Sequence, residues 1–460
     1  MIKLIGRTAS LLACFSFLLL GTHLQAGWQA GAAKIVITPE EDMWMAGYAS
    51  RKTPSEGVLQ DLHAKSLVLA DDEGNKIVMV TTDLVGIPRI IRENVVSAVS
   101  KKHQLRPDQI LLNASHTHCG PELRPSKSTI YELDPAIAAQ CHEYRLALEK
   151  KIEQVISESL KDLEPVDVTY TYGRAGFAMN RRYPLPNGSF KNSPYPAGPV
   201  QQQVPVLTAK TAEGGLKAIL FGYACHNTTT GIMQFNGDYA GAAQAILEKS
   251  HPGTIALFME GCGGDQNPYP RGQEKNIEQH GTALALAVET ALQDIRPTPL
   301  TGKIETVLGE VPIPFAKMPT RSELEEKLED GNVYVRRHAR LMLNRLDTEG
   351  SIPAEYPYMV QCLQLGNELT MVALAGEVVV DYDHLIREQL PVKNLWIAGY
   401  SNDVFGYVPS LRVLKEGGYE GGEAMIYSNL PGPFADSVED RILGEVQKLY
   451  GELENEKSAP

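Results

Sequence analysis

The chain lacks several features that would place it in a broad class. After residue 26 it has no apolar run near the ~20 residues that cross a bilayer, which excludes a membrane-spanning helix there. It lacks an excess of basic residues, and its formal charge of -13 argues against nucleic acid or an anionic membrane surface as a partner. It has no CxxC spacing and no internal repeat, so neither a zinc ribbon nor a solenoid is predicted.

Cysteine is scarce, and its number after residue 26 is odd. The positions are Cys119, Cys141, Cys225, Cys262 and Cys362. An odd number leaves at least one thiol unpaired. Some of these cysteines stand beside the polar segments described below, so a thiolate metal cluster is one interpretation. Small buried packing residues are the favoured one, because free cysteine is among the most buried residue types.

The first 26 residues have the pattern of an export signal. The parts, in order, are Lys3 and Arg7, the apolar stretch 11–20, and Leu24-Gln-Ala26 before Gly27. Cys14 lies inside the apolar stretch, which fits a lipoprotein site poorly, so we favour soluble export over a lipid anchor. We therefore predict a signal peptide at 1–26 and a periplasmic or secreted protein.

Apolar, β-branched runs alternate with stretches of helical periodicity along the rest of the chain. The predicted strands are residues 76–82, 109–113, 217–224, 254–259, 369–375 and 395–399. The predicted helices are residues 88–102, 143–163, 240–249, 277–292, 322–346 and 435–449. This alternation predicts an α/β fold, with α+β as the alternative, in which helices flank a large mixed sheet.

We expect one large domain, or two intimately packed ones, over residues 27–451, followed by a polar tail at 452–460 that frays. Residues 180–204 are rich in Pro, Gly and Asn, and a loop of this length is typical of a lid or rim. Residues 318–350 are charged and helical, which indicates a solvated surface insertion.

Polar residues able to do chemistry recur where the predicted strands end. The first case is His116-Thr-His118, directly after an apolar strand. The others are Asp83, Cys225-His226, Glu260 with Asp265 and Asn267, Gly376-Glu377, and Asn402-Asp403 with Tyr407. If these strand ends lie on one edge of a sheet, they form one site.

Histidines from separate strands together with the Glu377 carboxylate suit zinc, which takes N and O ligands and keeps a position for water when it is catalytic. Taken singly, His226 is more often a structural histidine, Glu377 a paired surface acid and Tyr407 a core aromatic. Their joint occurrence at strand ends favours the metal site. Asp265 is open to three readings: a metal ligand, a carboxylate that orients an imidazole, or a turn residue after glycines.

In order along the chain, these motifs resemble the catalytic domain of the neutral, non-lysosomal ceramidases. The matching elements are Ile37-Thr-Pro39, Ala46-Gly47-Tyr48, Leu62-His-Ala-Lys-Ser-Leu67, Thr82-Asp-Leu84, Ser115-His-Thr-His-Cys-Gly-Pro121, Cys225-His226, Gly264-Asp-Gln-Asn-Pro268, Gly376-Glu377, Tyr407-Val-Pro-Ser410 and Gly418-Tyr-Glu-Gly421. The His-Thr-His and Tyr-Val elements are the most specific of these. The resemblance implies a ceramidase-like fold over residues 27–451.

By motif, the resemblance implies a zinc ion and assigns residues to it. The implied ligands are His116, His226, Glu377 and Tyr407. It implies that His118 lies close to the substrate, and we predict catalytic roles for His118, Asn267 and Asp265. It further implies that Asn180, Arg181 and Tyr419 contact the substrate.

The chain departs from the family pattern at two points. Family members carry a serine, assigned as nucleophile, where this chain has Asn267, and an amide side chain cannot form an acyl intermediate. A zinc-activated water would remain as nucleophile, with Asn267 donating hydrogen bonds to the substrate or to a developing oxyanion. We also expect no β-sandwich-like C-terminal domain after the closing motif, which weakens the case for a lipid substrate.

Three functions follow as hypotheses. The first is an exported, zinc-dependent, ceramidase-like amide hydrolase that uses zinc-activated water, with His118 moving a proton to the leaving amine. The second is a zinc hydrolase of the same fold that acts on a non-lipid substrate, such as an acylated sugar or a peptide amide. The third is a binding protein in which a closed zinc site is only structural.

Overall fold

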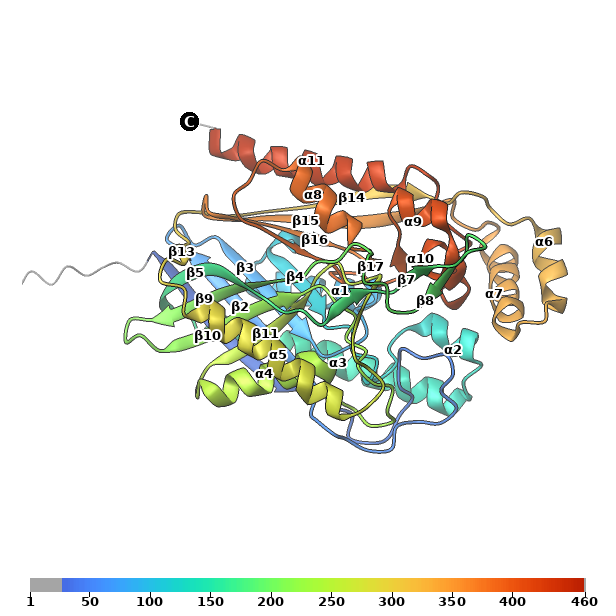
Figure 1. Cartoon of the computed structure of the whole chain (residues 1–460), viewed down its shortest axis with the longest axis horizontal. Helices are drawn as coiled ribbons and strands as arrows, with labels where there is room; N and C mark the ends of the chain where they lie inside the picture. Colours follow the sequence, from blue (N-terminus) through green and yellow to red (C-terminus); the bar gives the residue numbers. More distant parts are fainter. Residues whose placement is uncertain (1–26, 459–460) are drawn as a thin grey trace, which may run out of the picture.

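The computed structural model describes residues 27–458, so the signal peptide predicted for residues 1–26 lies outside the described residues. The fold consists of four layers: helices, a nine-stranded sheet, a four-stranded sheet and further helices (Figure 1). Both sheets contain parallel and antiparallel pairs. The predicted fold class, a large mixed sheet flanked by helices, is confirmed, and the second sheet is an addition to it.

The larger sheet has the strand order β11-β10-β9-β5-β1-β2-β3-β4, with β13 paired to β5. Its strands are β1 (Trp28–Val36), β2 (His63–Asp71), β3 (Lys76–Thr82), β4 (Ile110–Ala114), β5 (Glu164–Arg174), β9 (Gln203–Thr211), β10 (Leu216–Tyr223), β11 (Ile255–Glu260) and β13 (Thr298–Pro299). The smaller sheet has the order β14-β15-β16-β18. Its strands are β14 (Ile304–Pro314), β15 (Glu355–Leu365), β16 (Leu369–Leu374) and β18 (Leu395–Ala398).

Helices cover the outer face of each sheet (Figure 1). The nine-stranded sheet is covered by α1 (Arg89–His103), α3 (Pro135–Lys161), α4 (Asp238–Ser250) and α5 (Lys275–Leu292). The four-stranded sheet is covered by α8 (Asp381–Gln389) and α11 (Val438–Ser458). The remaining helices are η1 (Pro107–Gln109), α2 (Pro125–Tyr131), α6 (Arg321–Glu326), η2 (Lys327–Glu329), α7 (Val333–Glu349), α9 (Leu411–Glu416), α10 (Gly418–Gly421) and η3 (Glu423–Tyr427).

Alternation of side chains along the strands explains the layering. In β3, Val78 and Val80 pack in the cluster under α1 and α3, whereas Ile77 and Met79 pack in the cluster shared with the second sheet. Successive side chains of a strand point to opposite faces, so an uninterrupted apolar run must be covered on both. Trp396 of β18 is buried in that shared core.

The nine-stranded sheet curls until its two edge strands meet. The side chain of Asn113, in edge strand β4, accepts a hydrogen bond from the Glu260 amide of the other edge strand, β11, at 2.9 Å. The same side chain donates to the Gly399 carbonyl oxygen at 2.8 Å and to the Ser401 hydroxyl at 3.1 Å, just after β18. This one buried amide therefore joins three strand ends, which come from opposite edges of one sheet and from the other sheet.

The structure adds detail to three predicted segments. The helix expected over 322–346 is split into α6, η2 and α7, because Asn332 caps α7 by accepting from the Tyr334 amide at 2.9 Å. The insertion at 318–350 has a small core of its own around Leu324 and Met342. The predicted polar tail is helical to Ser458, since Leu453 is fully buried in the core cluster beneath α11.

The predicted loop at 180–204 is partly ordered into strands. β6 (Ala178–Asn180) pairs with β12 (Gln266–Pro268), and β7 (Arg182–Pro184) pairs with β8 (Phe190–Asn192). The last short pair, β17 (Glu377–Val378) and β19 (Tyr407–Val408), is parallel. These short pairs surround the strand ends at which the predicted site residues lie.

Candidate metal centre

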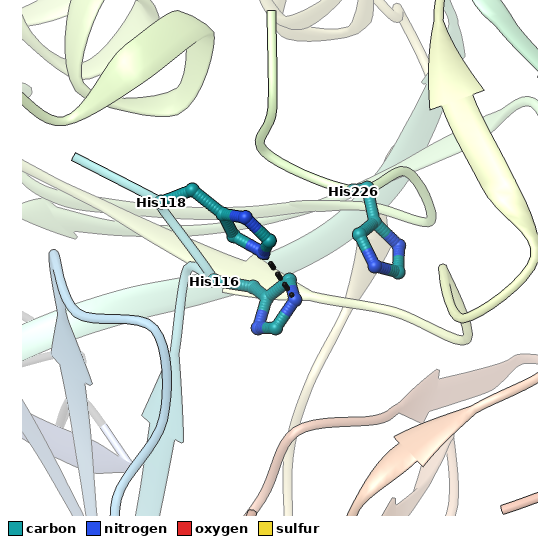
Figure 2. Close-up of side chains that lie close together, drawn as sticks. All are labelled: His116, His118 and His226. Atoms are coloured by element: carbon teal, nitrogen blue, oxygen red, sulfur yellow. Dashed lines mark hydrogen bonds between the residues drawn. The ribbon is translucent and has the colours of Figure 1, made fainter. Parts of the chain in front are cut away.

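Three histidines converge where the strand ends meet (Figure 2). His116 and His118 follow β4, and His226 follows β10. Their ring nitrogens lie within 4.8 Å of one another, and this is the group of the described residues that could hold a metal ion. His116 and His226 are 1% exposed, so the ion would be shielded from bulk water on their side.

Backbone carbonyl oxygens fix the orientation of two of these rings. His116 Nδ1 lies 2.6 Å from the Val85 oxygen, and His226 Nδ1 lies 2.7 Å from the Gly263 oxygen. A carbonyl has no proton to give, so each Nδ1 carries a proton, and in a neutral ring Nε2 then keeps its lone pair. Metal-binding histidines are typically held in this way.

His118 lacks such a support. Its buried Nδ1 has no hydrogen-bond partner among the described residues, and its Nε2 lies 3.1 Å from His116 Nε2. Two nitrogens this close need a proton or a cation between them. His118 therefore fits either a third nitrogen ligand or a group that carries a proton beside the metal.

The carboxylate of Glu377 completes the convergence. Its Oε2 lies 3.3 Å from His116 Nε2 and 3.4 Å from His226 Nε2, yet it is among the buried atoms without a hydrogen-bond partner. Burial lowers the pKa of His226 to about 3. Burial alone would raise the pKa of Glu377, but the neighbouring imidazoles hold it well below its usual range. A neutral His226 imidazole beside an ionised carboxylate matches the protonation states that a metal ion requires.

Close backbone packing places Glu377. A Cβ on Gly264 would stand 2.6 Å from the Glu377 carbonyl oxygen, so the absence of a side chain there lets the two segments approach. The Glu377 amide donates to the Gly406 oxygen at 2.8 Å, within the β17–β19 pair. The same pair brings Tyr407 to the centre.

The hydroxyl of Tyr407 is the fourth predicted ligand atom near the imidazoles. It lies 3.1 Å from His226 Nε2, and the two rings are parallel within 7°. Arg181 Nη2 donates to this hydroxyl at 2.9 Å. Burial raises the pKa of Tyr407 well above its usual value. The predicted ligands His116, His226, Glu377 and Tyr407 are therefore brought together, although their roles stay a prediction.

Arg181 joins Tyr407 to two further buried groups. Its Nε donates to Glu420 Oε1 at 2.7 Å, and its Nη1 donates to Asn267 Oδ1 at 3.2 Å. Asn267 is 0% exposed, and its Nδ2 donates to Asn192 at 3.3 Å. Asn267 is thus separated from the imidazoles by Arg181 and Tyr407.

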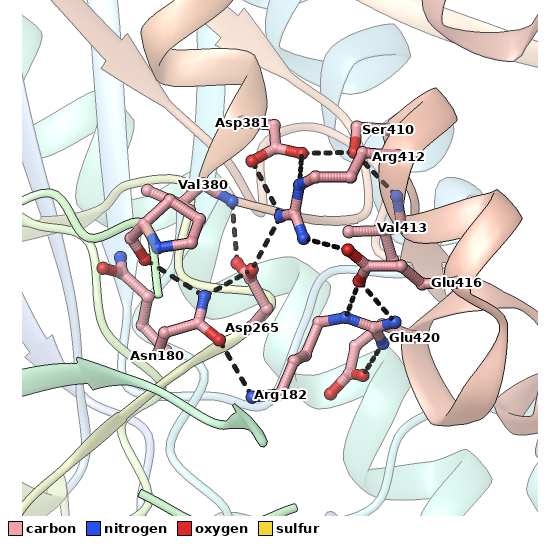
Figure 3. A network of polar contacts seen from close by, with 12 residues as sticks. Asn180, Arg182, Asp265, Val380, Asp381, Ser410, Arg412, Val413, Glu416 and Glu420 are labelled. Atoms are coloured by element: carbon pink, nitrogen blue, oxygen red, sulfur yellow. Dashed lines mark hydrogen bonds and ion pairs between the residues drawn. The ribbon is translucent and has the colours of Figure 1, made fainter. Parts of the chain in front are cut away.

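Asp265 and Asn180 belong to a network behind the ligands, shown in Figure 3. The carboxylate of Asp265 accepts from the Val380 amide at 2.8 Å and from Asn180 Nδ2 at 2.9 Å. Burial raises the pKa of Asp265 to about 6. Asp265 therefore holds the segment after Glu377, and its hydrogen bonds go to Val380 and Asn180 rather than to an imidazole.

Ion pairs extend the same network to the closing helices (Figure 3). Arg182 pairs with Glu416 at 3.1 Å and with Glu420 at 2.6 Å. Arg412 pairs with Asp381 at 2.9 Å and with Glu416 at 2.8 Å. Because these pairs are shared, α8, α9 and α10 are held in one arrangement around β17 and β19.

A cavity of about 190 Å³ opens beside the imidazoles. It is lined by His116, His118, Glu377 and Tyr407 of the predicted site, and by Tyr419, which is 41% exposed at its edge. Several further lining residues were missed by the sequence analysis: Tyr48, Arg124, Lys127, Tyr131 and Tyr427. Arg124 and Lys127 follow the His-Thr-His element within ten positions, and this proximity was the one available signal.

Four of the predicted site residues lie behind the cavity wall rather than on it: Arg181, Asn180, Asn267 and Asp265.

The cysteines are also outside the centre: all five in the described part of the chain are free and buried. Burial raises the pKa of Cys225 and Cys262 well above the usual value, which keeps both thiols neutral. The interpretation of the cysteines as packing residues is confirmed.

Backbone strain coincides with the centre. His116 has φ 61° and Tyr400, whose hydroxyl lies 3.3 Å from His226 Nδ1, has φ 47°. For residues other than glycine, this left-handed conformation costs on the order of 1–3 kcal/mol and is concentrated at functional sites. The strained backbone at His116 therefore carries one of the three converging imidazoles.

Comparison with known proteins gives a consistent relationship. The family model described as neutral/alkaline non-lysosomal ceramidase, N-terminal, matches residues 28–286, which is more than half of the chain and includes His116, His118 and His226. Neutral ceramidase A of Dictyostelium discoideum is 26% identical over 269 residues, which cover 54% of this chain and 37% of that protein. The chain thus spans little more than a third of the length of that curated relative.

Solved structures show the same fold. The crystal structure of neutral ceramidase from Pseudomonas aeruginosa superposes with a TM-score of 0.71 at 20% identity, covering 91% of this chain and 73% of that one. A ceramidase described as complexed with C2 gives a TM-score of 0.70 at 18% identity, covering 92% of this chain and 76% of that one. No helix in residues 27–458 is long and apolar enough to cross a membrane.

Proposed function

Because this chain belongs to the neutral/alkaline non-lysosomal ceramidase family, we propose that it is a metal-dependent hydrolase that cleaves an amide bond with activated water. One observation carries the proposal. His116 Nε2 and His226 Nε2 lie 3.3 and 3.4 Å from the unpartnered Glu377 Oε2, in a buried centre beside a cavity.

We propose zinc as the metal and His116, His226, Glu377 and Tyr407 as the residues that would hold it. Nitrogen and carboxylate ligands suit this ion. Zinc bound there would polarise the amide carbonyl and lower the pKa of a bound water to about 7. The chain supplies the fixed donor orientation, through the Val85 and Gly263 carbonyl oxygens.

We assign the transfer of the water proton to the leaving amine to His118. It lines the cavity, its Nε2 lies 3.1 Å from His116 Nε2, and its Nδ1 has no partner among the described residues. In hydrolysis the water oxygen bonds to the carbonyl carbon, the C–N bond breaks, and His118 moves the water proton to the amine nitrogen. General acid–base catalysis of this kind contributes roughly 10²- to 10⁴-fold.

The predicted residues behind the cavity wall act through others. Arg181 holds the Tyr407 hydroxyl at 2.9 Å, and Asn267 and Glu420 hold Arg181. Asn267, which stands where the family resemblance places a serine nucleophile, is buried and engaged at both polar atoms. In this chain we therefore assign Asn267 to positioning, not to attack on the substrate.

The substrate class is a second question, and one observation favours a non-lipid amide over ceramide. The cavity at the centre is only about 190 Å³, and four further tyrosines, an arginine and a lysine line it together with Phe405, smaller residues and the proposed ligands other than His226. Ligand cavities for long acyl chains are larger and mostly apolar.

We also propose export of the protein, for which the test is N-terminal sequencing of the purified mature chain.

The metal content and hydrolytic activity of His116→Ala and Glu377→Ala test the function. We expect both variants to lose stoichiometric zinc, measured by elemental analysis, and to fall to about one hundredth of wild-type amide hydrolysis or lower. His251→Ala is the matched control, because that histidine pairs with Glu289 at the surface and is predicted to change neither quantity.

Folded His116→Ala protein with full zinc and full turnover would remove the proposal. Wild-type protein that binds zinc tightly but hydrolyses no amide in a panel of short and long N-acyl substrates would instead establish the structural, non-catalytic site.

A further inference from the structure

The cavity beside the metal centre carries two cations that the proposed reaction does not use. Arg124 and Lys127 line this cavity. Among the described residues that line it, Glu377 has the one carboxylate. With Glu377 committed to the metal, the wall of the cavity has a positive excess. Such an excess is typical of a site that receives an anion.

Lys127 is buried without a compensating charge. It belongs to α2, is 7% exposed, and lies 5.6 Å from the centre of the Tyr131 ring. Its ammonium donates to the Tyr427 carbonyl oxygen, and no carboxylate of the described residues lies within ion-pair distance. Burying an unpaired charge is costly unless another group pairs with it.

Arg124 adds a second donor at the same wall. Its Nε and Nη2 bind Glu122 in a two-point contact, each at 2.7 Å. Its Nη1 makes no hydrogen bond with any described residue and so remains available to a ligand. A planar guanidinium with a free edge beside a lysine is a common arrangement for carboxylate recognition.

The two cations stand at the junction of two cavities. A neighbouring cavity of about 450 Å³ shares Arg124, Lys127, Phe405 and Ser428 with the smaller one. Its own arginines are already paired, Arg89 with Asp403 and Glu310, and Arg345 with Glu349. The uncompensated charge is therefore that of Lys127, within the same cavity as the metal centre.

We propose that the substrate is a small N-acyl compound with a carboxylate on its amine side, such as an N-acylated amino acid, and that Lys127 and Arg124 Nη1 bind this carboxylate. The inference rests on the proposed amide hydrolysis. A neutral lipid amide would leave the buried ammonium of Lys127 unpaired, whereas a carboxylate would pair with it. The carboxylate itself is unchanged in the reaction and leaves with the amine product.

The pH dependence gives a second readout. Burial and the neighbouring Arg124 lower the pKa of Lys127 to about 7, against the opposite effect of Glu122 and Glu377. Below that pH Lys127 is an ammonium and can bind the carboxylate; above it the charge is lost. The preference for carboxylate substrates should therefore decline as the pH rises through about 7, and an arginine at the same position should abolish the decline.

The test compares N-acetylglycine, which ends in a carboxylate, with N-acetylglycinamide, which ends in a neutral carboxamide of similar shape, and N-octanoylglycine with its amide, and it measures release of the acyl group. A phosphate pair, N-acetylethanolamine O-phosphate and N-acetylethanolamine, distinguishes a carboxylate site from a phosphate site. For the metal-loaded wild type we expect kcat/KM to favour the charged member by about tenfold or more, the effect of one hydrogen bond to a charged group. Lys127→Met should abolish the ratio, Lys127→Arg should retain it, and the exposed Lys393→Met should change nothing.

Wild-type protein that hydrolyses both members of each pair equally would overturn the inference and leave the proposed function intact. The same holds if Lys127→Met keeps the full preference, because the metal ion would then be the group that attracts the anion. If no amide is hydrolysed, the proposed function fails, and calorimetric binding of N-acetylglycine decides the inference alone: loss of binding in Lys127→Met supports it, and unchanged binding overturns it. A preference confined to the phosphate pair would replace the carboxylate.

Discussion

At the scale of single residues, Gly47 controls the position of His118. Gly47 has φ 95°, and a Cβ there would lie 2.4 Å from Cγ of the His118 ring. The ring could stay in place only if position 47 has no side chain. A substitution at position 47 can therefore displace the His118 ring while the imidazole itself stays unchanged.

We predict that Gly47→Ala keeps its zinc and loses roughly 10²- to 10⁴-fold in amide hydrolysis, because His118 moves the proton and does not hold the metal. Gly57→Ala is the matched control: Gly57 has φ 102° with nothing within 4 Å of the added Cβ, so it imposes a similar backbone strain without the clash. Elemental analysis and turnover of the two variants decide the question. If Gly47→Ala loses its zinc and Gly57→Ala does not, His118 is a metal ligand.

The same scale shows what the sequence could reveal of the site. It predicted that His116, His118, His226, Glu377 and Tyr407 come together, since each follows a recognisable strand or motif. It could not predict that Asn267 is enclosed by Arg181 and Asn192, because that depends on the β6–β12 and β7–β8 pairs. Nor could it reveal that Lys127 has no ion-pair partner, because that depends on which residues line the cavity around it.

At the scale of elements, the strands found from the sequence are those of the parallel pairs within the two large sheets. All six predicted strands correspond to β3–β4, β10–β11 and β16–β18, which are parallel, buried on both faces and joined by α1, α4 and α8. Such strands are continuous apolar runs. The strands that were missed, such as β5 and β14, contain charged residues or proline and pair only antiparallel.

Helix α11 provides the prediction at this scale. Val446, Leu449 and Leu453 recur at helical spacing and are buried in the core cluster that includes β15 and β16. We expect Leu453→Ala to lower the free energy of unfolding by about 2 kcal/mol, the lower end for a buried leucine because the site is close to the end of the helix. Urea denaturation measures the change, and Glu452→Ala, at an exposed neighbouring position, should alter it by no more than about 0.5 kcal/mol. Equal stability of the two variants would mean that this last part of α11 does not contribute to the core.

At the scale of the whole molecule, the proposed ligands come from both sheets. His116 and His226 follow strands of the nine-stranded sheet, while Glu377 and Tyr407 belong to the β17–β19 pair next to the four-stranded sheet. An ion held by all four would connect the two halves of the sandwich. Binding to the folded state alone stabilises it in proportion to the logarithm of the metal concentration.

We therefore predict that removal of the metal lowers the Tm of the wild type, and that zinc at a hundred times its dissociation constant restores about 2.7 kcal/mol of stability. Thermal unfolding across a zinc titration measures this dependence. Glu377→Ala should respond weakly and His251→Ala like the wild type. An equal zinc response in all three proteins would place the stabilising ion elsewhere.

The buried amide of Asn113 has a consequence for solubility. The outermost strand of an open sheet exposes unpaired backbone groups that can recruit a strand from another molecule and start aggregation. Here the Asn113 side chain occupies the Glu260 amide of β11, and the backbone of β4 bridges to Ser401. The residue that joins the ends of β4 and β11 thus lies where hydrogen-bonding groups of both borders of the sheet are already occupied and are closed to a neighbouring chain.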